Sequence, residues 1–437
     1  MDYHCAWDQG KHLWMVYLMR VIGAQTVLDK PGSVVLWTNC RHPIYDHNPY
    51  PQAAPPQRPV WVGDFGTCSA PGTPWSCRIP PPQRPARHPR LDEMSLPMNT
   101  PTVSLIDVST YLPENRVPAE WYAGHAGADN LRDNPMFAPP AYRHHAAFDE
   151  SNVDMIERAS AGLVARHGPE VLEDVDVLLT HSQMPDLPIV GAGGELAHRL
   201  GMTPQWILDV HNSGCAAFVS MLKLAQKLLA SGAGRTALIA AAANAAGKVF
   251  EQEQVRKLAQ SLVPGDGAAV GLLTLSDTSP VLDIECRFYG QNAGDMTLAA
   301  DPPRQWWQAG PGEGYVGFNE AKIMKVLARG NRQVPEVVRA VCDRIAVKPA
   351  DLDLLVTNQP NRLLLRNWHE ALEIPPERHR DTFGECGNLF AVGIPVNLEA
   401  AINDGQIAAG DVVMMAAFAH AGDFAGAAAI QWGGRPQ

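Results

Sequence analysis

The sequence predicts an α/β protein built from layers of helices and mostly parallel strands. Short apolar runs, typical of buried strands, alternate with longer stretches in which apolar residues recur at helical spacing. The chain has 437 residues, enough for about two to three domains or one duplicated unit. The order of predicted elements in the first half returns in the second half, which favours duplication.

Residues 1–93 differ in composition from the rest of the chain. They hold 14 of the 37 prolines and four of the eight cysteines. Proline removes backbone donors and interrupts helices, so we interpret this region as a poorly ordered, dispensable extension. Met94 or Met98 is a plausible alternative start, since ordered-looking sequence begins there. A regulatory or docking tail is the alternative interpretation.

The first predicted half spans residues 99–279. We expect strands at 103–113, 175–180, 206–210, 236–241 and 264–274, and helices at 150–167, 194–200, 217–229 and 255–262. The strands are apolar runs bounded by Gly, Pro or polar residues, and the helices repeat apolar residues every three or four positions. Alternation of this kind is typical of parallel sheets.

The centre of this half is a strand, a tight polar turn and a buried helix, with Cys215 where the helix begins. The first amides of a helix have no partner within it and carry the positive end of its dipole. A thiol placed there should have a lowered pKa and react as a thiolate. We therefore interpret Cys215 as a nucleophile; an inert core cysteine is the alternative.

The second half, residues 280–437, repeats the first. Residues 174–181 resemble residues 351–358, and the turn before Cys215 resembles the turn before Asn388. Two similar halves packed together would bring these two helix starts face to face across a pseudo-dyad. The pattern predicts that the amide of Asn388 lies beside the thiol of Cys215.

A set of motifs stands in a specific order and spacing, although each motif alone would be a weak signal. The motifs are Thr110-Tyr-Leu-Pro113, Gly214-Cys-Ala-Ala-Phe218, Gly265-Asp-Gly-Ala-Ala269, Thr357-Asn-Gln-Pro-Asn361, Gly387-Asn388 with Gly393-Ile-Pro395, and Phe418-Ala-His-Ala-Gly422. With this set, the chain from about residue 101 to residue 432 resembles the β-ketoacyl-carrier-protein synthase III family of the thiolase superfamily.

The resemblance implies a thiolase-like αβαβα fold of five layers, made of two pseudo-symmetric halves, and a homodimer. It also implies that Cys215 accepts an acyl group from a coenzyme A or acyl-carrier-protein thioester, with no resident cofactor. The N–H groups of Cys215 and of the Ala421–Gly422 turn would hold the oxyanion. Phe218 would contact substrate, and Arg362 would meet a phosphopantetheine arm or an acidic carrier protein.

The chain departs from the family pattern at Asn358, which stands where the family carries a catalytic histidine. Asn358 and Asn388 could still donate hydrogen bonds to a developing enolate oxygen. An amide cannot accept a proton at neutral pH, so general-base work is lost at this position.

A replacement base is available in the last turn of the predicted fold. His420 could approach Cys215 there, and Asp423 could orient its ring, as in Cys-His-Asp constellations. The alternative is that His420 only packs within the turn. His181 and His211 also lie near the site in sequence terms, but we expect structural roles for both.

Composition excludes several other classes of protein. The net charge of -11 argues against nucleic acid as a partner. No run of about 18 uncharged apolar residues is present, so we expect no membrane-spanning helix, and the N-terminus does not resemble a signal peptide. The cysteine spacing fits neither a disulfide framework nor a metal site, so we expect free thiols and a cytoplasmic protein.

We therefore expect an acyltransferase of the synthase III type. Cys215 would take an acyl group from a thioester and pass it to a hydroxyl or amine, in fatty-acid-like or specialised metabolite biosynthesis. Decarboxylative condensation with a malonyl thioester is the alternative within the enzyme class. A non-catalytic ketosynthase-like partner subunit is the alternative of another class.

Overall fold

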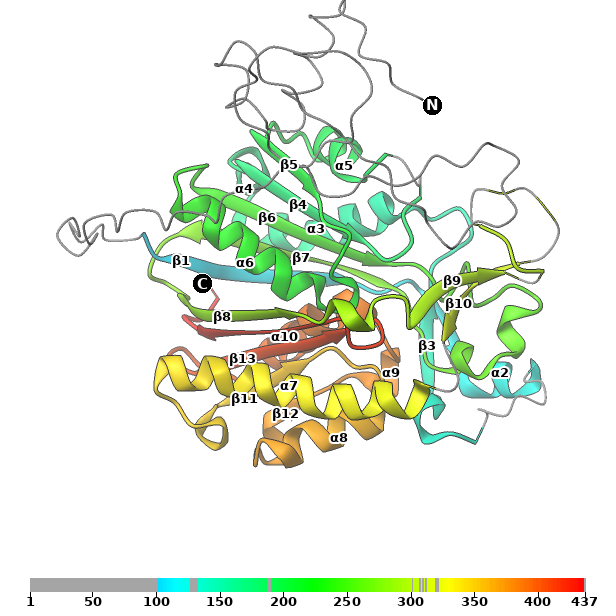
Figure 1. The fold of residues 1–437 in the computed structure, drawn as a ribbon. Coiled ribbons are helices and arrows are strands. Elements are labelled where there is room, and N and C mark those ends of the chain that lie inside the picture. The colour runs from blue at the N-terminus through cyan, green and yellow to red at the C-terminus, as the bar shows by residue number, and fades with distance from the viewer. Residues whose placement is uncertain are drawn as a thin grey trace, which may run out of the picture. The chain divides into compact units, whose positions relative to one another are not determined.

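The computed structural model describes residues 101–125, 133–186, 190–300, 302–305, 308, 310, 313–318 and 322–435. The extension predicted for residues 1–93 lies outside the described residues. Within them, two five-stranded sheets and their covering helices form the fold (Figure 1).

The two sheets have corresponding strand orders. The first contains β1 (Val103–Tyr111), β7 (Gly267–Leu275), β6 (Thr236–Ala243), β4 (Val177–Ser182) and β5 (Trp206–Asp209), in that spatial order. The second contains β8 (Val281–Phe288), β14 (Phe424–Gln431), β13 (Val412–Ala419), β11 (Leu354–Thr357) and β12 (His379–Arg380). Each strand of the first sheet thus has a counterpart in the second, as expected for a duplicated unit.

The expectation of mostly parallel strands is confirmed for strand direction, since four strands of each sheet run one way, but half of the neighbouring pairs are antiparallel. In the first sheet β4 runs parallel to β5 and β6, but β7 pairs antiparallel with both β6 and β1. The second sheet repeats this arrangement, with β14 antiparallel to β13 and β8. A short connection such as the turn between β13 and β14 can only join antiparallel neighbours, because a parallel pair needs a longer crossover.

Helices fill the space between the sheets and cover both outer faces (Figure 1). In β4, Val177 and Leu179 pack in the same core as helices α6 (Ala217–Ala230) and α10 (Gly393–Asn403), between the sheets. Leu178, which points to the opposite face, packs with α3 (Asn152–His167). Helices α7 (Ile323–Ile345) and α8 (Arg362–Ala371) pack on the outer face of the second sheet.

This sequence of helix, sheet, helix, sheet and helix confirms the predicted thiolase-like αβαβα fold. The smaller described elements include two antiparallel two-stranded sheets, β2 (Asn115–Pro118) with β3 (Tyr142–His145) and β9 (Met296–Ala300) with β10 (Gly314–Phe318), and the helices α2 (Ala119–His125), α4 (Glu170–Glu173), α5 (Gly193–Arg199) and α9 (Phe383–Cys386). The helix expected at 255–262 is instead two short 3-10 helices, η6 (Val255–Lys257) and η7 (Ala259–Leu262).

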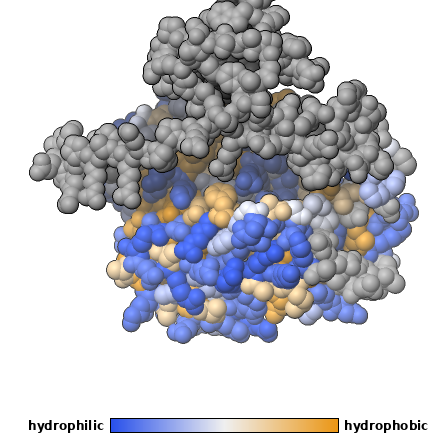
Figure 2. Space-filling view, viewed as in Figure 1, coloured by the Kyte–Doolittle hydropathy of each residue, from blue (hydrophilic) through white to orange (hydrophobic). Residues whose placement is uncertain are grey.

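The helices on the outside are amphipathic, as their sequences predict. Helix α3 begins with a capping box in which Ser151 and Asp154 exchange hydrogen bonds, and its apolar side is buried against the first sheet. Figure 2 shows mainly hydrophilic side chains on the face where α7 and α8 lie, with smaller hydrophobic areas between them. In the described part of the chain, no helix combines the length and the apolar character that crossing a bilayer requires.

Candidate active site

Cys215 lies in a short 3-10 helix, η5 (Gly214–Ala216), that leads directly into α6 in the central layer. Gly214 has a φ of 43°, a left-handed conformation that a residue with a side chain rarely adopts. The η5 segment contacts β13 of the second sheet and the 3-10 helix η12 (Phe390–Val392). Cys215 is therefore placed where the two halves meet, as the repeat predicts.

The predicted lowering of the Cys215 pKa is wrong. Burial raises the pKa of this thiol to about 12, and the negative charge of Asp423 acts in the same direction. Hydrogen bonds from the backbone N–H groups of Cys215 and His420 oppose this rise in the pKa, but the loss of solvation outweighs them. In the resting protein the thiol is neutral, so its reaction requires a base.

His420 lies in the turn between β13 and β14, and its imidazole is held next to the start of η5. Its Nδ1 atom is 2.8 Å from Oδ1 of Asp423. Its Nε2 atom is 2.6 Å from the position that a Cβ on Gly214 would occupy, so the ring packs directly on that glycine. The pair therefore presents a His–Asp arrangement beside the residue that precedes Cys215.

The backbone of the same turn supplies the second N–H group that faces the thiol. That group belongs to His420, which precedes the predicted residues Ala421 and Gly422. The N–H of Gly422 donates to the Ala419 carbonyl at 3.0 Å, and the Ala421 carbonyl accepts from Arg329. The described hydrogen bonds of Ala421 and Gly422 thus stabilise the turn, and the N–H group that faces the thiol is that of His420.

Asn388 lies just before η12, the segment that contacts η5. Its Oδ1 accepts from the N–H of Phe390 at 3.0 Å, and its backbone pairs with the loop that contains Val263 and Gly265. Among the residues that the structure describes, none accepts a hydrogen bond from its Nδ2 group. The amide nitrogen of Asn388 is therefore available to a substrate oxygen.

Asn358 is held differently. It is completely buried, and its Nδ2 donates to the Phe418 carbonyl at 3.1 Å. Its Oδ1 accepts from the Phe418 N–H at 3.3 Å. The nitrogen and the oxygen of this side chain therefore connect the end of β11 to β13. The sequence did not indicate this structural role.

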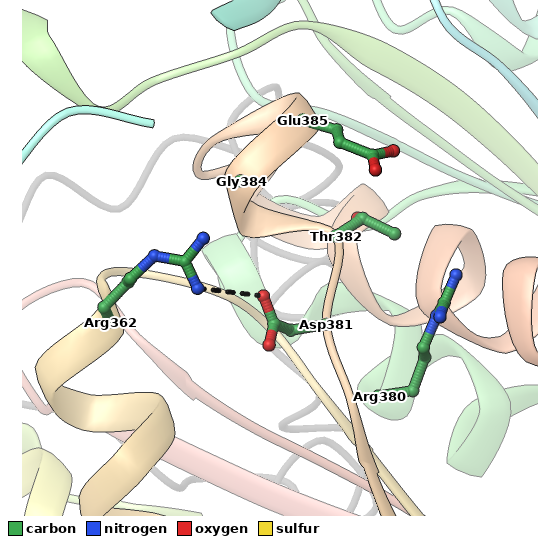
Figure 3. A pocket seen from close by; sticks show the side chains of 6 residues that line it. All are labelled: Arg362, Arg380, Asp381, Thr382, Gly384 and Glu385. Atoms are coloured by element: carbon green, nitrogen blue, oxygen red, sulfur yellow. Dashed lines mark ion pairs between the residues drawn. The ribbon is translucent and has the colours of Figure 1, made fainter. Parts of the chain in front are cut away.

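Phe218 and Arg362, the two other residues predicted to contact the substrate, lie in different parts of the structure. Phe218 is fully buried in the core, and its ring packs closely over Gly271 of β7, which leaves it no exposed surface. Arg362 is exposed at the start of α8 and forms a 3.9 Å ion pair with Asp381. It lines a polar pocket of about 240 Å³ with Arg380, Asp381, Thr382, Gly384 and Glu385 (Figure 3).

Two further histidines, His181 and His211, lie near the end of β4 and the turn before Cys215. His181 is buried at the end of β4, and its Nδ1 lies 2.8 Å from the Val210 carbonyl. His211 is exposed, with its ring centroid 6.5 Å from that of His181. In the described residues, no three His, Cys, Asp or Glu side chains are grouped so that they could hold a metal ion.

The chain is similar in sequence to known proteins. Residues 208–290 match the family model described as 3-Oxoacyl-[acyl-carrier-protein (ACP)] synthase III, and residues 342–432 match the model of its C-terminal part. The chain is 25% identical over 321 residues to a Beta-ketoacyl-[acyl-carrier-protein] synthase III from Gloeobacter violaceus, covering 72% of this chain and 90% of that protein. It is 29% identical over 296 residues to the protein of that name from Thermosynechococcus vestitus, covering 66% and 86%.

Solved structures show the same fold. The 3-oxoacyl-(acyl carrier protein) synthase III of Pseudomonas aeruginosa has a TM-score of 0.65 at 22% identity, covering 77% of this chain and 100% of that one. The cerulenin-bound OleA of Xanthomonas campestris has a TM-score of 0.64 at 18% identity, covering 76% and 97%. The fold is therefore that of the thiolase superfamily. Two segments of the chain match the synthase III family models, and the curated relatives show a similarity to 3-oxoacyl-[acyl-carrier-protein] synthase III at 25–29% identity.

Proposed function

We propose that the protein is an acyltransferase that carries an acyl group on Cys215. The donor is a coenzyme A or acyl-carrier-protein thioester, and the acceptor is a hydroxyl or an amine. The observation that carries this proposal is the His420–Asp423 pair beside Gly214, because it supplies a base next to a neutral thiol. No resident cofactor takes part, since coenzyme A or phosphopantetheine enters and leaves with the substrate.

In the first half-reaction, His420 takes the proton of Cys215 while Asp423 holds the ring by its Nδ1–H. The thiolate attacks the carbonyl carbon of the thioester, and the donor's C–S bond breaks. The N–H groups of Cys215 and His420 face the position where the oxyanion develops. The proton on His420 then leaves with the donor thiol.

In the second half-reaction, the acceptor's oxygen or nitrogen attacks the acyl carbon on Cys215, the C–S bond to Cys215 breaks, and the acceptor's proton ends on the sulfur, which restores the thiol. The Nδ2 group of Asn388 supports this step as a donor to the acyl or acceptor oxygen. The pocket beside Arg362 and Arg380 supports an approach of the phosphate of the donor's pantetheine arm, because guanidinium groups pair well with phosphate (Figure 3). A homodimer is part of the proposal through the family resemblance.

Decarboxylative condensation is the second candidate, and the free amide of Asn388 favours it. That reaction needs two donors on the enolate oxygen, and Asn358 already uses both ends of its amide on Phe418. One of the two Nδ2 hydrogens of Asn358 is thus committed to the fold, and its amide is turned toward Phe418, so we place acyl transfer first.

Intact mass spectrometry tests the proposal directly. The full chain is mixed with acetyl-CoA, longer acyl-CoA thioesters and acyl-carrier protein, and we expect an acyl adduct that disappears in Cys215→Ala. Cys286→Ala is the matched control, because Cys286 is also a partly buried free thiol. Absence of an adduct with every donor would overturn the enzyme proposal and favour a non-catalytic partner subunit.

A further inference from the structure

The imidazole of His181 is buried, and its hydrogen bond to the backbone determines which ring nitrogen carries the proton. Its exposed fraction is 3%, and Nδ1 lies 2.8 Å from the Val210 carbonyl. A carbonyl only accepts, so the proton sits on Nδ1 and Nε2 carries a lone pair. Burial lowers the pKa of His181 to about 4, so the ring stays neutral at physiological pH.

Although the Gln183 side chain lies close enough to raise the pKa of the ring, no donor lies within hydrogen-bond distance of Nε2 of His181 in the part of the chain that the structure describes. The same holds for two buried acceptors nearby in the fold, Oε1 of Gln183 and Oδ1 of Asn244. Gln183 follows β4 and Asn244 follows β6, its parallel neighbour, so both lie at the end of the sheet where His181 lies. Buried acceptors are normally paired, so these three indicate a place for a ligand that donates hydrogen bonds.

This place is linked to the nucleophile through the chain and through His420. Nδ1 of His181 donates to the carbonyl of Val210. Val210 directly precedes the turn that leads through Gly214 to Cys215. The charges of His211 and His420 also lower the pKa of His181, so all three imidazoles lie close together. His181 and His420 thus reach the region of Cys215 from different elements, one from β4 and one from the turn after β13.

The three hydrogen-bond acceptors indicate which kind of second substrate fits this place. An imidazole nitrogen and two carboxamide oxygens are neutral, and Asp423 is already paired with His420. An alkylamine is an ammonium ion at neutral pH, so it must lose a proton and its hydration before it can enter a site of neutral acceptors and attack, whereas a hydroxyl compound enters in its neutral form. These neutral acceptors therefore favour a hydroxyl compound over an amine.

We propose that Nε2 of His181 accepts the proton of the second substrate's hydroxyl group as that oxygen attacks the acyl group on Cys215. This inference rests on the proposed function and narrows its acceptor to a hydroxyl compound. The new C–O bond forms, the C–S bond to Cys215 breaks, and the proton moves from oxygen to Nε2. It then passes to the departing sulfur, which restores the thiol and the neutral imidazole.

The experiment separates the two half-reactions. Cys215 is acetylated in the full chain with excess acetyl-CoA or with p-nitrophenyl acetate, and loss of the adduct is followed by intact mass. The probes are water, 1-propanol and propylamine. His181→Asn is the main variant, because its amide can still donate to the Val210 carbonyl while the basic nitrogen is gone. His211→Ala is the matched control, a neighbouring but exposed imidazole.

For His181→Asn we expect acylation at the wild-type rate, and transfer to water and 1-propanol slowed about 100-fold. Transfer to propylamine should change much less, and His211→Ala should behave as wild type. Unchanged transfer to water and propanol in His181→Asn would overturn the inference while leaving the proposed function intact. If no donor acylates Cys215 in the wild type, both the inference and the proposed function are overturned. This result is seen in the acylation step, before transfer is measured.

Discussion

The Nδ1 atom of His420 lies 2.8 Å from Oδ1 of Asp423, across the turn that joins β13 to β14. The backbone of this turn is held from outside at Gly422, whose carbonyl accepts from Asn292 at 2.6 Å and from Gln333 at 3.0 Å. His420 itself has a φ of 49°, a strained value for a residue with a side chain. Strain that is held in place by several contacts is typical of functional turns.

We expect Asp423→Asn to slow acylation of Cys215 about 100-fold, because His420 loses the carboxylate that orients its ring and stabilises its positive charge. The fold should be unaffected, since the substitution keeps the size of the side chain. Acylation is measured by intact mass with acetyl-CoA, and thermal unfolding serves as the control. If Asp423→Asn were acylated at the wild-type rate, the contact between His420 and Asp423 would serve only to stabilise the turn.

Gly214→Ala should separate His420 from Cys215. A Cβ at this position would meet Nε2 of His420 at 2.6 Å, and the φ of 43° is unfavourable for alanine. We expect a loss of unfolding free energy of about 1–2 kcal/mol and at least a tenfold loss of acylation. Gly194→Ala is the matched control, because it lies in α5 with open space around it and should be neutral or slightly stabilising.

Alkylation of Cys215 should depend steeply on pH. Burial raises the pKa of its thiol to about 12, so at pH 7 only a very small fraction is thiolate. We expect the rate with iodoacetamide, measured by peptide mapping, to rise about tenfold per pH unit between pH 7 and 10. A plateau above pH 8 would instead indicate a thiol of ordinary or lowered pKa, as the position at a helix start first suggested.

Asn358→Ala tests the structural task assigned to this residue. The variant removes both hydrogen bonds to Phe418 inside a fully buried region, so we expect a loss of about 2 kcal/mol of unfolding free energy. Acylation of Cys215 should stay within about threefold of the wild-type rate. If stability were unchanged while carbon dioxide release from malonyl-carrier protein disappeared, Asn358 would be a substrate donor and condensation would become the better proposal.

The local patterns of the sequence were enough for most of the elements and for their repetition. The apolar runs at residues 175–180 and 351–357 correspond to β4 and β11, and the helical spacing after Cys215 corresponds to α6. The direction of neighbouring strands was not predictable in the same way. It depends on how a connection returns to the sheet, and the hairpin between β13 and β14 is visible only once both strands are paired.

The chain by itself therefore determined the αβαβα fold and pointed to Cys215, Asn388 and His420 as site candidates. The repeated halves, Cys215 and Asn388 rest on residue type, spacing and repetition, which are properties of short segments, whereas the five layers and the role of His420 were implied by the resemblance to the synthase III family. Only the tertiary structure decided that the thiol of Cys215 is neutral, that Asn358 is committed to Phe418, and that His181 keeps a free lone pair. Solvation and hydrogen-bond pairing depend on which distant segments come together, and no local pattern in the sequence encodes that.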